Sequence, residues 1–183
     1  MKHNIAVLVE NKAGVLSRIS GLFARRGFNI DSLAVGTTED PKISRITIVV
    51  EGDDYIAEQV TKQLNKLVDV IKVRNLREHE LTRRELCLIK VEIDESKRGE
   101  IIDIAKIMDC EIVDITHTTL MLEFDDRPER VDLLIELLGK YRILEMARTG
   151  AIALATVFAN FPLVFIFPPL PHSGEINFPT FFL

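Results

Sequence analysis

The sequence predicts an α+β protein with two successive domains, each built from strands and helices in the order βαββαβ. Three observations support this prediction. Alternating apolar residues mark strands, apolar residues at helical spacing mark helices, and the same order of elements occurs twice along the 183 residues. A chain of this length can form two small domains that bury their cores without disulfide bonds.

The first unit spans residues 2–76. An alternating strand at 3–9 is followed by apolar residues at helical spacing, and Gly27 ends this helix because glycine readily adopts positive φ. Asp53 or Asp54 can cap the free N–H groups of a second helix. The remaining strands of this unit are expected at 30–35, 46–50 and 68–73.

A second unit follows a highly charged segment. Residues 77–85 are charged at most positions and are expected to form a linker, and residues 86–150 repeat the order of the first unit. Pro128 is tolerated in the first turn of a helix that Gly139 ends. Strands are expected here at 87–93, 112–115, 120–124 and 141–147, and helices at 101–108 and 128–138.

Two βαββαβ units predict two ferredoxin-like sandwiches, each an antiparallel sheet with two helices on one face. The other face of each sheet must be solvated or covered by a partner. Strand residues are apolar on both sides, since Leu86 and Leu88 lie opposite Cys87 and Ile89. Exposed apolar faces or edges usually mark an interface, so the pattern predicts an oligomer.

The reactive side chains favour binding over catalysis. The sequence contains no phosphate-binding loop, nucleophile elbow or zinc-protease motif, and its four His have no metal-ligand spacing. Cys87 and Cys110 fall in predicted strands and are expected to be buried, inert thiols. The Asp125-Asp126 pair lies where a helix cap is expected. We therefore expect no catalytic residue, metal site or cofactor on this chain.

Two other functions share this topology. RNA-binding modules of βαββαβ order stack bases on aromatic residues of a central strand, but residues 44–50 contain none. Acylphosphatases bind phosphate with an arginine in the first loop, where this sequence offers only Lys12. The net charge of −5 also argues against nucleic acid as a partner.

The loop at 11–16 is the most informative segment. Gly14 precedes the first helix without a side chain, so a ligand can approach its backbone closely. The N–H groups of Gly14, Val15 and Leu16 are expected to be unpaired and to point outward. A helix N-terminus of this kind binds carboxylates.

Three polar residues lie in or after this helix–loop region. Asn11 and Asn29 can each donate and accept hydrogen bonds, and Asp31 could offset an ammonium group. Together with the loop they match the carboxylate and ammonium groups of a small amino acid. The same residues are also typical of an ordinary turn and of a helix exit.

Seven segments, spread in order over both units, match one known family. They are VENKAGVLSRISGLFARRGFNI, DSLAVG, SRITIVV and QLNKLVDVIKV in the first unit, and RELCLIKV, EIVDIT and EMARTGAIAL in the second. In these motifs the chain resembles the small subunits of acetohydroxyacid (acetolactate) synthase. The resemblance covers residues 2–155 and identifies the first unit as an ACT domain and the second as ACT-like.

The resemblance implies a regulatory subunit with no active site of its own. Its large, catalytic partner would hold thiamine diphosphate, Mg²⁺ and FAD and condense two pyruvates, or pyruvate and 2-oxobutyrate. This reaction opens the synthesis of the branched-chain amino acids valine and isoleucine. The small subunit would activate the large one and mediate feedback inhibition by valine. A stand-alone ACT-domain sensor that controls a different enzyme is the alternative.

The resemblance also implies that ACT domains pair side by side in a homodimer, with the effector at their interface. One protomer would contribute an effector loop that contains Asn11, Gly14, Val15 and Leu16. The partner protomer would contribute Asn29 and Ile30, and Asp31 is added because its carboxylate suits an ammonium group.

Residues 151–183 read as an apolar tail, rich in Pro and Phe, that departs from the family pattern near residue 155. We expect no membrane anchor, because Pro162, Pro168 and Pro169 break the apolar run and no positive flank follows it. An atypical extension and a changed reading frame both remain open. The N-terminal residues show no apolar run long enough for a secretory signal before charge intervenes, and with two cysteines that are expected to be free we expect a cytoplasmic protein.

Overall fold

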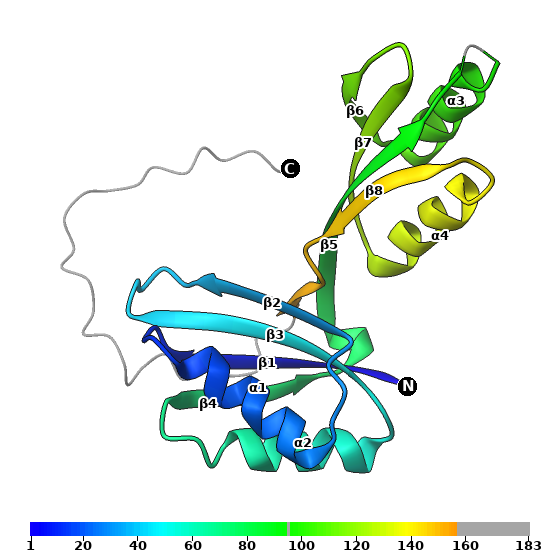
Figure 1. Ribbon diagram of the computed structural model, residues 1–183. Coiled ribbons are helices and arrows are strands. Elements are labelled where there is room, and N and C mark those ends of the chain that lie inside the picture. The colour runs from blue at the N-terminus through cyan, green and yellow to red at the C-terminus, as the bar shows by residue number, and fades with distance from the viewer. Residues whose placement is uncertain (95, 157–183) are drawn as a thin grey trace, which may run out of the picture.

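The computed structural model describes residues 1–94 and 96–156 and contains both predicted βαββαβ units (Figure 1). The elements of the first unit are β1 (Lys2–Glu10), α1 (Val15–Arg26), β2 (Ser32–Thr37), β3 (Ile43–Glu51), α2 (Asp54–Leu64) and β4 (Val70–Leu76). Those of the second are β5 (Leu81–Glu92), α3 (Arg98–Met108), β6 (Glu111–Ile115), β7 (Thr119–Asp126), α4 (Pro128–Leu138) and β8 (Ile143–Arg148). A 3-10 turn, η1 (Glu78–Glu80), joins the units, and a short strand, β9 (Ile152–Ala155), follows them.

Both sheets have the same antiparallel order. The first runs β2-β3-β1-β4 and the second β6-β7-β5-β8, so the first and third strands of each unit are central. Ile5 lies opposite Ile48 in the first sheet, and Cys87 lies opposite Phe124 in the second. The predicted ferredoxin-like fold is therefore confirmed for both units.

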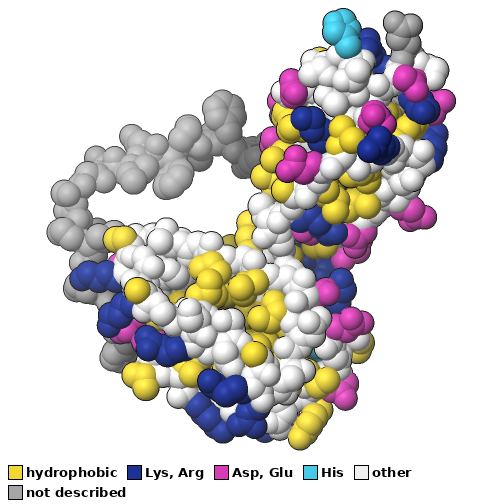
Figure 2. Space-filling model, viewed as in Figure 1, with side chains coloured by type: hydrophobic (Ala, Val, Ile, Leu, Met, Phe, Trp, Pro, Cys, Tyr) yellow, Lys and Arg dark blue, Asp and Glu magenta, His cyan; other side chains and the backbone are white. Residues whose placement is uncertain are grey.

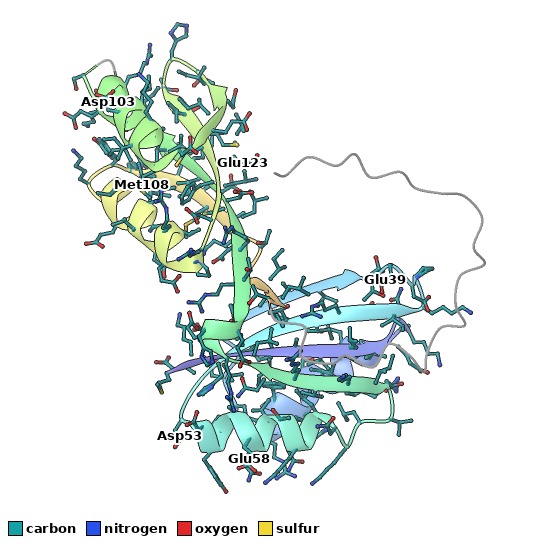
Figure 3. The ribbon with its side chains drawn as sticks, turned by 180° about the vertical axis from the view of Figure 1, so that it is seen from behind. Glu39, Asp53, Glu58, Asp103, Met108 and Glu123 are labelled. Carbon is teal, nitrogen blue, oxygen red and sulfur yellow. The ribbon has the colours of Figure 1, made fainter. Side chains whose placement is uncertain are left out.

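Local sequence explains where the first two helices begin and end. Gly14 (φ 85°) precedes α1 and Gly27 (φ 69°) follows it, and both adopt the left-handed conformation that glycine tolerates best. At the start of α2, the Asp53 carboxylate accepts a hydrogen bond from the Ile56 N–H at 2.9 Å, as predicted for a cap. Figure 3 shows Asp53 at this helix start, with Glu58 further along the helix.

Each unit has its own apolar core between its helices and one face of its sheet. In the first core Phe23 packs edge-on against Phe28, with ring centres 6.1 Å apart. Strand residues at every second position point into these cores, as the alternation predicts. The fully buried strand and helix residues include Ile5, Ile19, Ile48, Ile89, Ile101 and Leu134.

The structure differs from the predicted linker and tail boundaries. Of the charged segment 77–85, residues from Leu81 onward belong to β5, and of the segment 151–183, Ile152–Ala155 forms β9. β9 pairs antiparallel with the first half of β5, with Thr82 opposite Leu154. Residues 81–85 therefore form a strand, because they pair with the remote β9, although their charge predicted a linker.

β9 covers part of the face of the first sheet that was expected to be solvated or covered by a partner. Ala153 packs against Ala6 and Leu76 on the side of the first sheet away from the helices, and Leu81 and Ala155 border this cluster. In Figure 1, β5 rises from this region toward the second unit. The remainder of the predicted tail, residues 157–183, lies outside the described residues. Within the described part, no helix is long and apolar enough to cross a membrane.

Candidate functional site

The loop between β1 and α1 is anchored on the turn between β2 and β3. The Asn11 backbone N–H donates to the Lys42 carbonyl at 2.7 Å, and the Asn11 side-chain amide donates to the Pro41 carbonyl at 2.8 Å. Sequence reasoning offered Asn11 as a ligand group. The structure instead uses its amide N–H to hold the loop, which leaves the side-chain oxygen as the atom that can accept a hydrogen bond.

Gly14 leaves the start of α1 open. A Cβ atom added there would meet only the Arg18 guanidinium, at 3.9 Å, so the constraint on this position is its φ of +85° rather than space. The described residues place no hydrogen-bond acceptor on the N–H groups of Gly14 or Leu16. The Val15 N–H, also expected to be free, approaches the Lys12 carbonyl at 3.4 Å.

The two apolar residues of the loop face in different directions. Val15 is 4% exposed and belongs to the first core, whereas Leu16 is 43% exposed. The side chain of Val15 is therefore not available to a ligand, while the side chain of Leu16 can contact an apolar group outside the chain.

The dipole of α1 favours an anion at this helix start, and the two nearby cationic side chains are each paired with a carboxylate. The first turn of α1 contains no acidic residue, so no side chain of that turn opposes an anion at the positive end of the helix dipole. Lys12 pairs with Glu10 at 2.7 Å, and Arg18 pairs with Asp69 at 2.9 Å. The hydrogen bond to Glu10 raises the pKa of the Lys12 ammonium.

The other predicted residues lie at the opposite end of α1. Asn29 and Ile30 follow Gly27 and precede β2, and α1 has twelve residues, which separates its two ends by about 18 Å. Asn29 is exposed, and Ile30 packs partly against the first core. One chain therefore does not bring Asn29 and Ile30 next to Gly14.

Asp31 already has a partner. Its carboxylate lies 2.8 Å from the Lys2 ammonium, and its backbone N–H donates to the Val49 carbonyl at 2.9 Å. The hydrogen bond to Asp31 raises the pKa of Lys2. The sequence pattern assigned Asp31 to a ligand ammonium and missed Lys2, because the two residues are far apart in sequence and meet only through the pairing of both β1 and β2 with β3.

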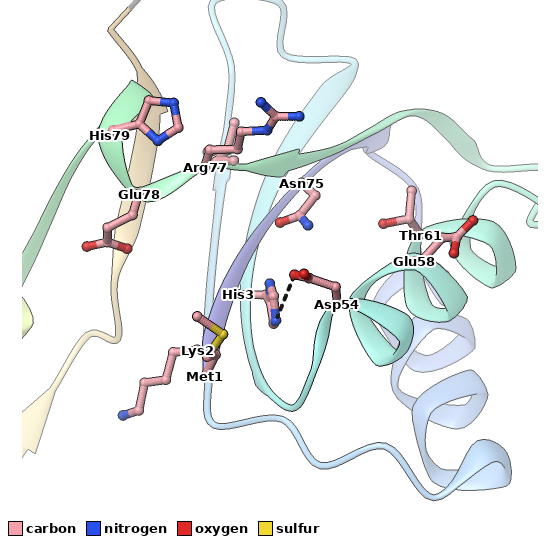
Figure 4. Close-up of a pocket in the computed structure, with 11 residues that line it drawn as sticks. Met1, Lys2, His3, Asp54, Glu58, Thr61, Asn75, Arg77, Glu78 and His79 are labelled. Carbon is pink, nitrogen blue, oxygen red and sulfur yellow. Dashed lines mark ion pairs between the residues drawn. The ribbon is translucent and has the colours of Figure 1, made fainter.

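The cysteines and His3 of the described residues lie away from the α1 start. Burial raises the pKa of the Cys87 thiol and raises that of Cys110 to about 11, which disfavours reactive thiolates. His3 lines a separate cavity of about 680 Å³ at the start of β1, and its Nε2 lies 4.0 Å from the Asp54 carboxylate (Figure 4). Among the described residues, no group of three His, Cys, Asp or Glu side chains could hold a metal ion.

Comparison with known proteins decides the family. The model of the AHAS small subunit-like ACT domain matches residues 5–72, and that of the small subunit of acetolactate synthase matches residues 84–157. The chain belongs to the acetolactate synthase small-subunit family. All seven predicted effector residues fall inside the matched ACT domain.

Individual members of the small-subunit family align over most of the chain. A probable acetolactate synthase small subunit of Archaeoglobus fulgidus is 53% identical over 154 residues, which cover 84% of this chain and 96% of the relative. The acetolactate synthase small subunit of Mycolicibacterium smegmatis is 46% identical over 153 residues, which cover 84% of this chain and 90% of the relative. The crystal structure of the small subunit from Thermotoga maritima superimposes with a TM-score of 0.79 at 40% identity, covering 85% of this chain and 97% of that chain.

Proposed function

We propose that this chain is the regulatory subunit of acetolactate synthase, which activates the large, catalytic subunit and confers feedback inhibition by valine. Membership of the small-subunit family supports the regulatory role. The observation that supports an amino-acid effector is the open start of α1 at Gly14, with N–H groups available to a carboxylate.

A homodimer would complete the site, and the geometry of β2 supports this proposal. β2 is an edge strand of the first sheet, and Asn29 and Ile30 lie just before it. The Gly14 loop is anchored on the turn that follows β2, so the two halves of the site lie at opposite ends of this strand. If two copies pair their β2 edges about a twofold axis, the strands run antiparallel. The Gly14 loop of one protomer then faces Asn29 and Ile30 of its partner.

Apolar side chains at the β2 edge are exposed in the single chain and could be buried by a second protomer. Val35, on β2, is 49% exposed, and Leu16, at the start of α1, is 43% exposed. Figure 2 shows apolar side chains gathered over β2 on the face in view. Pairing through β2 would remove both side chains from water, which favours association by about 25 cal/mol for each Å² of apolar surface buried.

Five of the seven proposed residues contact valine in this proposal, while Asn11 anchors the loop and Val15 packs in the first core. The carboxylate of the effector accepts hydrogen bonds from the Gly14 and Leu16 N–H groups, which lie at the positive end of the α1 dipole. The side chains of Leu16 and of the partner's Ile30 contact the isopropyl group of valine. The side-chain amide of the partner's Asn29 forms a hydrogen bond with the carboxylate or the ammonium group of valine. The effector ammonium shares the Asp31 carboxylate with Lys2.

Inhibition by valine is a coupling free energy between two sites. Valine must bind the low-activity arrangement of the complex more tightly, and the large subunit must then change valine affinity by the same factor. A coupling of about 1–3 kcal/mol corresponds to roughly 5–150-fold effects. The thiamine diphosphate, Mg²⁺ and FAD of the reaction belong, in this proposal, to the large subunit, and the complex works in the cytoplasm.

Reconstitution with the large subunit encoded by the same genome tests the proposal. We expect the small subunit to copurify with this thiamine-diphosphate enzyme, to raise its rate of acetolactate formation, and to make that rate sensitive to valine. A small subunit that binds valine but neither copurifies with the large subunit nor activates it would favour a stand-alone sensor instead.

A further inference from the structure

One segment joins the candidate effector region to the second domain. We call residues Arg148–Ala153 the strap, because they leave the end of β8 and cross to the first sheet. The strap starts against β5, where the Thr149 N–H donates to the Leu86 carbonyl at 3.0 Å and the Leu86 N–H donates to the Thr149 hydroxyl at 3.1 Å.

The strap is fixed to the second domain by a nearly buried ion pair. Arg148 donates two hydrogen bonds to the Glu85 carboxylate, both 2.8 Å long, and a third of 2.8 Å to Asp132 on α4. Glu85 is only 5% exposed. Arg148 thus bonds the start of the strap to both β5 and α4. A shift of the strap would therefore displace or break these contacts with the second domain.

The other end of the strap is fixed to the first domain by contacts with β2 and β3. The Ala151 N–H donates to the Ser32 hydroxyl at 3.0 Å, and the Arg45 guanidinium donates to the Ala153 carbonyl at 2.8 Å. Gly150 has a φ of +76°, and a Cβ added there would lie 2.6 Å from the Ser32 hydroxyl oxygen. The strap therefore approaches Ser32 as closely as a residue without a side chain allows.

Ser32 is the first residue of β2 and directly follows Asn29–Asp31. Asp31 lines the cavity of about 570 Å³ that opens between the two domains, and so do Ser32, Arg148 and Gly150. Four consecutive strap residues, 148–151, line this open space. One hydrogen bond from Ala151 and one close approach of Gly150, both to the Ser32 hydroxyl, thus link the residue that follows Asn29–Asp31 to the strap.

We propose that the strap couples the effector site to the second domain, so that valine bound beside Asn29–Asp31 is sensed through Ser32 and Gly150. This inference rests on the proposed function. It assigns the strap a role in transmitting the effect of valine and no role in binding it.

Two variants weaken the contact without touching the proposed effector residues. Ser32→Ala removes the acceptor of the Ala151 N–H, and Gly150→Ala places a methyl group against Ser32 in a backbone conformation that alanine resists. Gly99→Ala is the matched control, because it lies in α3 of the second domain and a Cβ there meets no atom within 4 Å.

The experiment measures valine binding and inhibition separately. Calorimetry on the small subunit without the large subunit gives the valine Kd free of coupling to the large subunit, and the rate of acetolactate formation by the complex at saturating valine gives the extent of inhibition. For Ser32→Ala and Gly150→Ala we expect a valine Kd within threefold of wild type and a residual activity at saturating valine at least threefold higher. Gly99→Ala should match wild type in both measurements.

Two results would overturn the coupling role. Wild-type inhibition in folded Ser32→Ala would show that the contact transmits nothing, and this holds even if Gly150→Ala fails to fold. A valine Kd weakened more than threefold in the variants would place the strap in the binding site. If the wild-type complex neither binds valine nor is inhibited by it, the proposed function fails, and the coupling fails with it.

Discussion

At the scale of single residues, Gly14 combines two properties that no other residue supplies together. Its φ of +85° suits the left-handed turn before α1, and its missing side chain leaves the Leu16 N–H accessible. Asn and Asp tolerate this conformation better than other residues with side chains. The position can therefore be probed with two isosteric substitutions that differ only in charge.

We expect Gly14→Asp to remove valine inhibition while activation of the large subunit is largely retained. The new carboxylate would lie where the effector carboxylate is proposed to bind and would repel it. Gly14→Asn has the same size without the charge, and it should retain more sensitivity. The measurement is the rate of the reconstituted enzyme against valine concentration, and full valine sensitivity of Gly14→Asp would show that the site is elsewhere.

Asn29 tests the contribution of the partner protomer. Asn29 is exposed in the single chain, so Asn29→Ala should change stability by less than about 0.5 kcal/mol. Loss of its hydrogen bond to the effector should weaken valine binding by about 1 kcal/mol, or roughly fivefold. Calorimetry measures this, and an unchanged valine Kd would exclude Asn29 from the site.

At the scale of elements, α3 illustrates how a local sequence builds a helix start. The Asp94 carboxylate accepts hydrogen bonds from the Ser96 hydroxyl at 2.6 Å and from the Ser96 and Lys97 N–H groups at 2.9 Å. The bonds from Ser96 and then the ion pair with Lys97 lower the pKa of Asp94 to about 2. The ionised carboxylate therefore holds the turn that leads into the helix.

This depressed pKa predicts a pH dependence. Because the pKa is lower in the folded state, Asp94 stabilises the fold above about pH 4, the range in which an unfolded Asp is ionised, and this contribution disappears as the pH falls toward 2. Asp94→Asn should lower the urea midpoint at pH 7 and converge with wild type near pH 2. Asp103→Asn, on the exposed side of the same helix, is the control and should not change the midpoint.

The periodicity of the sequence predicts the elements but not the contacts between the two units. Alternation and helical spacing arise within each element, so both βαββαβ orders were predictable. The charges of segment 77–85 were misleading because their partners are remote. Glu85 is buried against Arg148, and Arg83 pairs with Glu129 as well as with the nearby Glu78. Nothing local distinguishes such paired charges from solvated ones.

For the candidate site, too, the sequence predicts the local features but not the contacts between remote segments. The Gly14 turn and the helix exit before Asn29 are local features, so the sequence locates them directly. The anchoring of Asn11 on the β2–β3 turn and the pairing of Asp31 with Lys2 depend on strand pairing over some thirty residues. Their effect on which atoms remain free for a ligand therefore required the structure.

At the scale of the whole molecule, the two domains differ in how their sheet faces are covered and in which sheet edges expose apolar residues. The first domain has one sheet face partly covered by β9, and it leaves the edge at β2 free within the chain. The second domain exposes apolar residues on both edge strands, including Ile112, Ile115, Leu144 and Met146. We expect the homodimer to form through the β2 edge, because this pairing completes the proposed site.

Val35→Glu tests the assembly. Val35 is half exposed on β2, and two glutamates brought together across a twofold axis repel each other. We expect the dimer Kd, measured by sedimentation, to rise at least tenfold and valine inhibition to be lost with it. Ile107→Glu, at a more exposed position on α3, is the control and should leave the dimer intact. A Val35→Glu protein that stays dimeric would place the interface elsewhere.

The pairing of β9 with β5 also sets an order of events during synthesis. Leu81 meets Ala155 only after more than seventy further residues have been made, and Ala153 must arrive before Ala6 and Leu76 are covered. The first domain can form its helix-side core as soon as β4 leaves the ribosome, but it then keeps an uncovered apolar face until the second domain is complete. The junction between the domains is therefore expected to form last, and a ribosome stalled before residue 150 should hold a nascent chain whose first domain is folded but prone to aggregate.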